Sequence, residues 1–286
     1  MTGLTGLVNI ARDRVSLEKL EAAFGEKSRL AAKGDLRFSP GAQPYQLGGD
    51  YSLTEFDAGK LFKALEPGKA PTVEGTFTIT GQLAGTGETL DRTIGRTRGR
   101  FELTSRQGIF RGLQRSSSKV SMTSKAVELG ASVLGSILGS QKATKAAEKV
   151  AGTAYFVDQL AQSIAELNYD QLNVRLVRDE SLNMRLEDFS LVSPEIRLLG
   201  KGEVTYAADK PLLEQPLSVS LSLAGRGKTE HLLNKLHLTD GSRDELGYAR
   251  ITQPITVAGS LAKPDPSAFF TKIAASKLTD FLSPDN

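Results

Sequence analysis

The chain of 286 residues contains no cysteine and no tryptophan, and it has only two histidines. The lack of cysteine excludes disulfides and thiolate metal sites, and it fits a cytoplasmic and a periplasmic protein equally well. Aromatic residues make up 6% of the chain, so the apolar side chains are mainly Leu, Val, Ile and Ala. No apolar run is long enough to span a bilayer, and the N-terminus lacks the apolar core of a signal peptide.

Motifs of catalysis are also missing. His231 and His237 are six residues apart, which on a helix places them about 240° apart rather than on one metal-binding face. The sequence from Gly85 to Leu90 begins like a dinucleotide loop but lacks the third glycine, and no spacing rule selects a pair of carboxylates. We therefore expect a protein that is not an enzyme and has no cofactor and no metal.

The charge is weakly basic overall but concentrated in one run. The net charge of +3 is too small to indicate nucleic-acid binding by itself. Between Arg92 and Lys125, however, nine basic residues stand against the single acid Glu102. This run is either a solvated strand face with a loop or a contact for anionic lipid headgroups or lipopolysaccharide phosphates. RNA is a further possibility, but the run lacks the interleaved aromatic residues that single-strand binders use. Its candidate anion contacts are Arg92, Arg96, Arg98, Arg100, Arg106, Arg111 and Arg115.

Alternation of apolar and polar residues recurs along the chain and predicts strands. The expected strands are Gly34–Ser39, Pro44–Leu53, Val73–Gly81, Arg98–Thr104, Gln171–Arg178, Ser181–Ser190, Glu195–Tyr206, Pro216–Ala224 and Ile251–Leu261. Helical spacing predicts helices at Glu55–Leu65, Lys125–Asn168, Lys228–Leu236 and Pro266–Phe281, with Asp57 near the start of the first. The chain thus divides into a β-rich part (1–124), a helical segment (125–168) and a β-rich part with a terminal helix (169–286).

The expected strands have one apolar and one polar face, which favours an antiparallel sheet. The apolar face has to be covered, and the long helical segment can cover only part of it. Either two sheets pack as a sandwich, or one sheet curls and leaves its inner face available to an apolar ligand. Base rates favour the sandwich. Tyr155, Phe156 and Leu160 are expected on the buried stripe of the helical segment.

Three blocks carry a resemblance to a known family. Gly75–Leu113 has a Gly-bounded strand, a G-x-G step, and then G-x-F-x-L with a Gly-Ile turn. Ser193–Gly225 has paired strands around a second G-x-G, and Gly247–Asp265 has a closing strand with a Pro-Asp exit. In these patterns the chain resembles the C-terminal region of the AsmA family, within the bridge-like lipid transfer proteins that include TamB and YhdP.

This resemblance implies a β-rich (α+β) fold: an elongated, curved, mainly antiparallel sheet forming an open groove, with one long helical segment and a C-terminal capping helix. It implies a non-enzymatic envelope protein that holds phospholipid acyl chains for transfer between membranes and for outer-membrane assembly. The implied location is periplasmic, tethered to the inner membrane in a longer parent chain. The implied partners are phospholipid and a membrane surface or envelope proteins, without nucleic acid. The alternative is a protein-binding scaffold without lipid cargo.

Candidate groove residues are the apolar positions of the expected strands. Each has a second interpretation as an ordinary core residue. The candidates are Phe77, Ile79, Phe101, Leu103, Leu172, Val174, Leu176, Leu182, Met184, Leu186, Leu217, Val219, Leu221 and Leu223.

Overall fold

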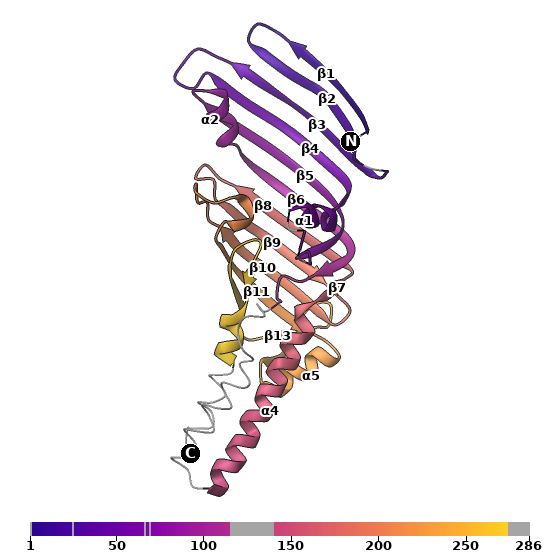
Figure 1. Ribbon diagram of the computed structural model, residues 1–286, viewed down its shortest axis with the longest axis vertical. Coiled ribbons are helices and arrows are strands. Elements are labelled where there is room, and N and C mark those ends of the chain that lie inside the picture. Colours follow the sequence, from indigo (N-terminus) through magenta and orange to yellow (C-terminus); the bar gives the residue numbers. More distant parts are fainter. Residues whose placement is uncertain (1, 25, 66, 69, 115–139, 274–286) are drawn as a thin grey trace.

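The computed structural model describes residues 2–24, 26–65, 67–68, 70–114 and 140–273, and most of their strands join one long sheet (Figure 1). Hydrogen bonding follows the order β1-β2-β3-β4-β5-β6-β8-β9-β10-β11-β13-β12, while β14 pairs with β11 and β15, and β7 pairs with β6. Every pairing is antiparallel. The strands are β1 (Thr2–Ile10), β2 (Arg14–Phe24), β3 (Ser28–Phe38), β4 (Tyr45–Asp57), β5 (Val73–Gly87), β6 (Arg98–Phe110), β7 (Leu167–Tyr169), β8 (Gln171–Arg178), β9 (Met184–Val192), β10 (Ile196–Val204), β11 (Leu217–Gly225), β12 (Thr239–Arg243), β13 (Ala249–Ile251), β14 (Ile255–Gly259) and β15 (Pro264–Asp265).

Helices interrupt the strand sequence at a few points. They are α1 (Ala58–Leu65), α2 (Leu90–Gly95), α4 (Ser140–Ala165), α5 (Lys228–Lys235), the short 3-10 turn η1 (Leu212–Glu214) and a helical stretch at 267–273. The Asp57 carboxylate accepts a hydrogen bond from the Lys60 amide at 3.1 Å, which satisfies a free donor in the first turn of α1. Thr89 caps α2 in the same way, accepting from the Arg92 amide at 3.3 Å.

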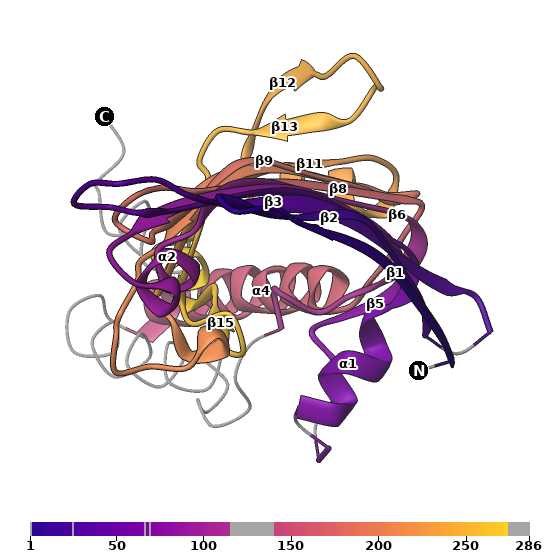
Figure 2. The same ribbon diagram turned by 90° about the horizontal axis from the view of Figure 1, so that it is seen from above.

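The register of the strands places the apolar residues on one face. Leu53 of β4 lies opposite Ile79 of β5, and Ile79 lies opposite Leu103 of β6. Leu103 in turn lies opposite Val174 of β8, which faces Phe189 of β9. Because side chains alternate between faces along a strand, these opposed positions form apolar rows across the sheet. The sheet arches, and α4 lies on its concave side (Figure 2). Because Leu160 and Ile164 of α4 belong to the same core cluster as the apolar strand residues, the apolar face is the concave one.

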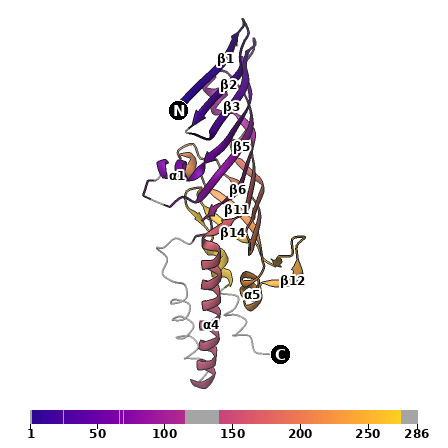
Figure 3. The same ribbon diagram turned by 90° about the vertical axis from the view of Figure 1, so that its right-hand side faces the viewer.

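The long helix α4 covers this concave face at one end of the sheet, whereas at the other end only the short helices α1 and α2 pack against β4 and β5. Figures 2 and 3 show α4 running beneath the arch at the β8–β11 end, on the side away from the β12–β13 hairpin. Leu160 and Ile164 of α4 are fully buried there with Leu113 and with Phe270 of the terminal helical stretch. Leu191, Leu198, Leu221 and Leu223 form the sheet side of this core.

The fold confirms the curved antiparallel sheet with a long helix and a C-terminal helix. The sandwich favoured by base rates is wrong, because strands from before and after the helical segment join one sheet. The predicted helix Lys125–Asn168 begins at Ser140 and ends at Ala165 in the described part, and residues 125–139 lie outside it. Tyr155 is 58% exposed rather than on the buried stripe, whereas Leu160 is buried there.

Within the described residues, no helix is both long and apolar enough to cross a membrane.

Candidate functional site

The concave face of β1–β5, which we call the open half, carries an apolar trough. Most of its side chains are partly or largely exposed, although Ala22 of β2 and Phe77 of β5 are buried. Leu4 and Ile10 at its edge are 62% and 75% exposed. The trough includes a depression of about 450 Å³ on its floor. The apolar side chains around this depression are Val8, Val15, Leu17, Leu30, Ala32, Leu36, Leu47, Tyr51 and Leu83.

Glycines deepen the floor of the trough. Gly34 of β3 lies opposite Gly49 of β4, and a Cβ on Gly34 would come within 2.6 Å of the Gly48 carbonyl oxygen. The Tyr51 ring occupies the space above Gly81, where a Cβ would lie 2.5 Å from a ring carbon. Burial in this position raises the pKa of the Tyr51 hydroxyl, so it stays neutral at physiological pH. The floor therefore offers mainly apolar contact, and the charged residues that also border it are Lys33, Asp35 and Asp50.

The trough ends where the concave face becomes covered. The Tyr51 and Phe101 rings lie 6.3 Å apart across β5 and mark the approach to this boundary. Beyond it, in the closed half (β8–β11 and β14), Leu198 and Leu223 have no exposed surface. The same apolar rows thus pass from an accessible surface into a packed core.

The predicted groove residues divide along this boundary. Six of them belong to the closed core and line no open groove, because α4 and the 267–273 stretch cover them: Phe77, Leu172, Leu186, Val219, Leu221 and Leu223. A second set is partly exposed and packs against the core edge: Ile79, Leu103, Val174, Leu176 and Leu217. Phe101 and Met184 are also partly exposed on the concave face, while Leu182 lies in the β8–β9 turn at φ 69°, outside any strand.

Sequence reasoning missed most of the trough itself. It placed no strand before Gly34, yet β1, β2 and much of β3 lie there. The signal in β2 is present, since Val15 and Leu17 alternate with polar residues. A bulge then shifts the register between Leu17 and Leu20, which breaks the period-two pattern where a strand would otherwise be recognised.

The basic run of the sequence does not form one surface patch. Arg92 lies in α2, which is on the concave side (Figure 2), and Arg96 is the C-terminal cap of this helix. Arg98, Arg100 and Arg106 alternate along β6 with residues of the concave face, so they point to the convex side. Arg92 pairs with Glu88, Arg98 with Glu180, and Arg100 with Glu187 at 3.9 Å. Arg115 lies outside the described residues.

Arg111 has an internal role that overturns its interpretation as an anion contact. Its mostly buried guanidinium lies 2.5 Å from the Glu74 carboxylate and 2.9 Å from that of Glu166, and it donates to the Pro71 carbonyl at 3.1 Å. Burial works to lower the pKa of Arg111, but the two carboxylates outweigh it and raise the pKa above its usual value. This arginine therefore ties β5 and the loop before it to the end of α4.

The G-x-G step of the family-like block has a packing reason. Gly85 and Gly87 lie in β5 beneath α2, and a Cβ on either would come within 2.6 Å of Thr93. Only glycine lets the fully buried Thr93 of α2 approach the sheet this closely. The G-x-G thus seats a short helix at the margin of the trough, and no phosphate-binding loop is formed there.

Within the described ranges, no group of three or more His, Asp or Glu side chains is placed to hold a metal ion. A scan against protein-family models and searches of curated proteins and of solved structures give no match for this chain. What the chain does therefore has to be argued from the trough and the surfaces around it.

Proposed function

We propose that this chain is a non-enzymatic lipid-holding protein whose open half shields the acyl chains of phospholipid in the trough. In this proposal it acts in the cell envelope, receiving lipid from a membrane surface or from neighbouring envelope proteins for transfer between membranes and outer-membrane assembly. The resemblance to the AsmA family points in the same direction.

The observation that carries the proposal is the uncovered apolar face of the open half. Soluble proteins rarely leave a contiguous apolar surface of this kind exposed unless it binds something. Here the depression of about 450 Å³ is lined by aliphatic side chains of Leu, Val and Ala, with Tyr51 as its aromatic member. Covering such a surface with acyl chains is favourable by roughly 25 cal/mol per Å² of apolar area removed from water.

The shape of the trough suits a ligand of variable length. The apolar rows run across neighbouring strands, with glycines in the floor at some positions. They form an open surface that no wall closes at the β1 edge. Aliphatic contact is not directional, so chains of different length and unsaturation are accommodated alike. At the other end the closed half is filled by side chains of its own, which limits the cargo to the open half.

In this proposal the lipid headgroup contacts the arginines of α2 and its C-terminal cap. Among the predicted anion contacts, Arg92 and Arg96 are exposed on the concave side beside β4 and β5, and α2 contacts both strands. Arg92 has Glu88 as its partner, whereas no carboxylate in the described part of the chain pairs with Arg96. A phosphate at the trough margin would therefore meet Arg96 first.

A protein-binding scaffold is the second candidate, and the β1 edge favours it. The strand TGLTGLVNI carries no charge and no proline, although edge strands are usually protected by such residues. An incoming strand of a partner could pair with β1 and cover the exposed Leu4 and Ile10. This mode needs the edge of the sheet and leaves the floor of the trough unused.

Lipid extraction and mass spectrometry of the purified chain test the proposal. We expect phospholipid to co-purify, and we expect Leu36→Glu on the floor of the trough to abolish it while the unfolding midpoint stays near that of the parent. A matched control is Arg37→Gln, the next residue of β3, which points to the convex face. Lipid-free protein that does not take up phospholipid from vesicles would contradict the proposal and favour the scaffold.

A further inference from the structure

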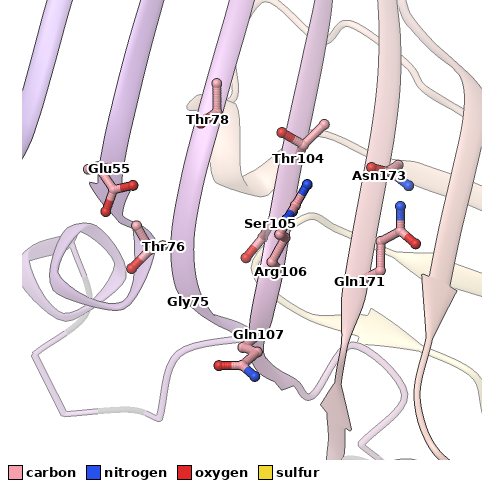
Figure 4. A pocket seen from close by; sticks show the side chains of 10 residues that line it. All are labelled: Glu55, Gly75, Thr76, Thr78, Thr104, Ser105, Arg106, Gln107, Gln171 and Asn173. Atoms are coloured by element: carbon pink, nitrogen blue, oxygen red, sulfur yellow. The ribbon is translucent and has the colours of Figure 1, made fainter.

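A polar depression lies on the convex face, opposite the trough. It has a volume of about 650 Å³ and is formed by β4, β5, β6 and β8 (Figure 4). This volume is in the range of about 300–1,000 Å³ typical of small-molecule sites. Besides Ser105, whose hydroxyl bonds to Tyr169 on the core side, its hydroxyl and carboxamide side chains are Thr76, Thr78, Thr104, Gln107, Gln171 and Asn173.

The depression follows a line of irregularities in the sheet. The β4–β5 register shifts between Leu53 and Phe56, and the β5–β6 register shifts between Gly75 and Phe77. On its other edge, β6 pairs with β8 as far as Ser105 and with β7 from Gly108 onward, so this strand change lies beside the two register shifts. Glu55 sits at the first shift with φ 54°, a left-handed conformation that few non-glycine residues adopt. Bulges in neighbouring strands hollow the face here, and such bulges are often found beside functional sites.

The floor of the depression is fixed from the core side. The Tyr169 hydroxyl donates to the Glu74 carbonyl oxygen at 3.0 Å and lies 3.0 Å from the Ser105 Oγ, which donates to it. Gly75 at φ 144° and Gly108 make room for this hydroxyl, since a Cβ on either would approach it within 2.4 Å. The shape is therefore held by a buried network and does not depend on the side chains around the rim.

The rim side chains have their hydrogen-bonding groups free. Elsewhere on the convex face several charged residues pair with each other, as Arg175 does with Glu102 at 3.0 Å. In contrast, none of the six hydroxyl and carboxamide side chains, nor Arg106, makes a side-chain hydrogen bond to another described residue. Hydroxyl and carboxamide groups both donate and accept. Glu55 and Arg106 add opposite charges that cancel.

From this lining we propose that the convex depression binds a neutral, hydroxyl-rich ligand, namely a short saccharide. A sugar presents donors and acceptors together on each hydroxyl, which matches groups of the same dual character. A phosphate or a carboxylate ligand fits less well, because Arg106 is the only cation of the lining and Glu55 would repel an anion. The site lies on the opposite face from the trough, so this inference stands independently of lipid binding.

Saturation-transfer NMR on the full chain tests the inference, with maltose, cellobiose and N,N′-diacetylchitobiose as probes. We expect at least one of the three to bind, and we expect Asn173→Leu to weaken that binding about tenfold by removing a donor and an acceptor. Thr78→Val removes one hydroxyl with little change in volume and should weaken binding severalfold. The matched control is Thr80→Val, on the same strand and face but outside the depression.

Failure of all three sugars to bind would overturn the inference. It would also be overturned if Thr80→Val weakened binding as much as Thr78→Val, because the contact would then not be in the depression. Lipid loading, measured on the same variants, should stay at the parent level, which keeps this test separate from that of the trough.

Discussion

The open half and the closed half of the sheet have the same strand pattern and differ in what covers it. Leu47 of β4 and Leu221 of β11 both point to the concave face, yet Leu47 is partly exposed and Leu221 is only 3% exposed. The cover of the closed half comes from α4 and from residues 267–273, which are far from the strands in sequence. An apolar strand face therefore does not by itself tell whether a residue is core or binding surface.

A charge in the closed half should have the largest effect on stability. Leu221→Glu places a carboxylate among packed aliphatic side chains, and we expect it to lower the free energy of unfolding by about 4 kcal/mol or more. Urea unfolding measures this. Leu221→Met preserves volume and apolarity and should cost less than about 1.5 kcal/mol. A Leu221→Glu protein as stable as its parent would mean that the closed half is open.

Loss of the Tyr169 hydroxyl should have a smaller effect at the same end of the sheet. Tyr169→Phe leaves the buried Glu74 carbonyl and the Ser105 hydroxyl without their shared partner, which costs about 1–3 kcal/mol. Tyr206→Phe is the control, because Tyr206 is 43% exposed and its hydroxyl has no hydrogen-bond partner among the described residues. Equal stability of the two variants would show that the network does not hold the bulges.

Acid should weaken the closed half through Asp244, the one charged side chain among the buried described residues. Burial acts to raise the pKa of Asp244, but the Tyr248 amide at 2.9 Å, Arg197 at 2.9 Å and the Leu246 amide at 3.0 Å together lower it. Because the folded-state pKa lies below the unfolded one, this stabilisation is present above the unfolded pKa and is lost as pH falls through the folded pKa.

We therefore predict that the protein loses stability on acidification and that part of this loss is due to protonation of Asp244. We expect Asp244→Asn to be less stable than its parent at neutral pH and to lose less stability on acidification, as measured by urea unfolding at several pH values. Asp209→Asn is the control, since Asp209 is exposed in the loop between β10 and η1 and makes no side-chain hydrogen bond or ion pair to another described residue. If the free energy of unfolding of Asp244→Asn fell with pH as steeply as that of the parent, Asp244 would not be a source of the acid sensitivity.

A charge in the open half should affect stability least. Leu47→Glu keeps its carboxylate in contact with water, so we expect a change in unfolding free energy within about 0.5–1 kcal/mol. Phospholipid loading, however, should be lost. Gln46→Glu adds the same charge to the adjacent, exposed convex position and should leave both properties unchanged. Equal lipid loading in the two variants would contradict the proposal that phospholipid binds in the trough.

Much of the fold could be predicted from period-two patterning and helical spacing, and the α1 and α5 helices were expected close to their observed bounds. The single curved sheet was predicted only through the family resemblance, because alternation shows that a face is apolar and not what covers it. For that reason Leu172 and Leu223 were assigned to a groove although α4 and the 267–273 stretch bury them. The polar depression was not predicted either, since the bulges that create it depend on register between strands.

The lack of cysteine allows one direct measurement of the central claim, that one apolar face is open at one end and closed at the other. Single cysteines at Leu36 and Leu47 in the open half, and at Leu198 and Leu221 in the closed half, can be labelled with a maleimide in native buffer, with and without phospholipid vesicles. We predict fast labelling at the first pair that slows when lipid is added, and labelling at the second pair only after unfolding. Equal rates at all four positions, or no effect of lipid at Leu36 and Leu47, would contradict the account.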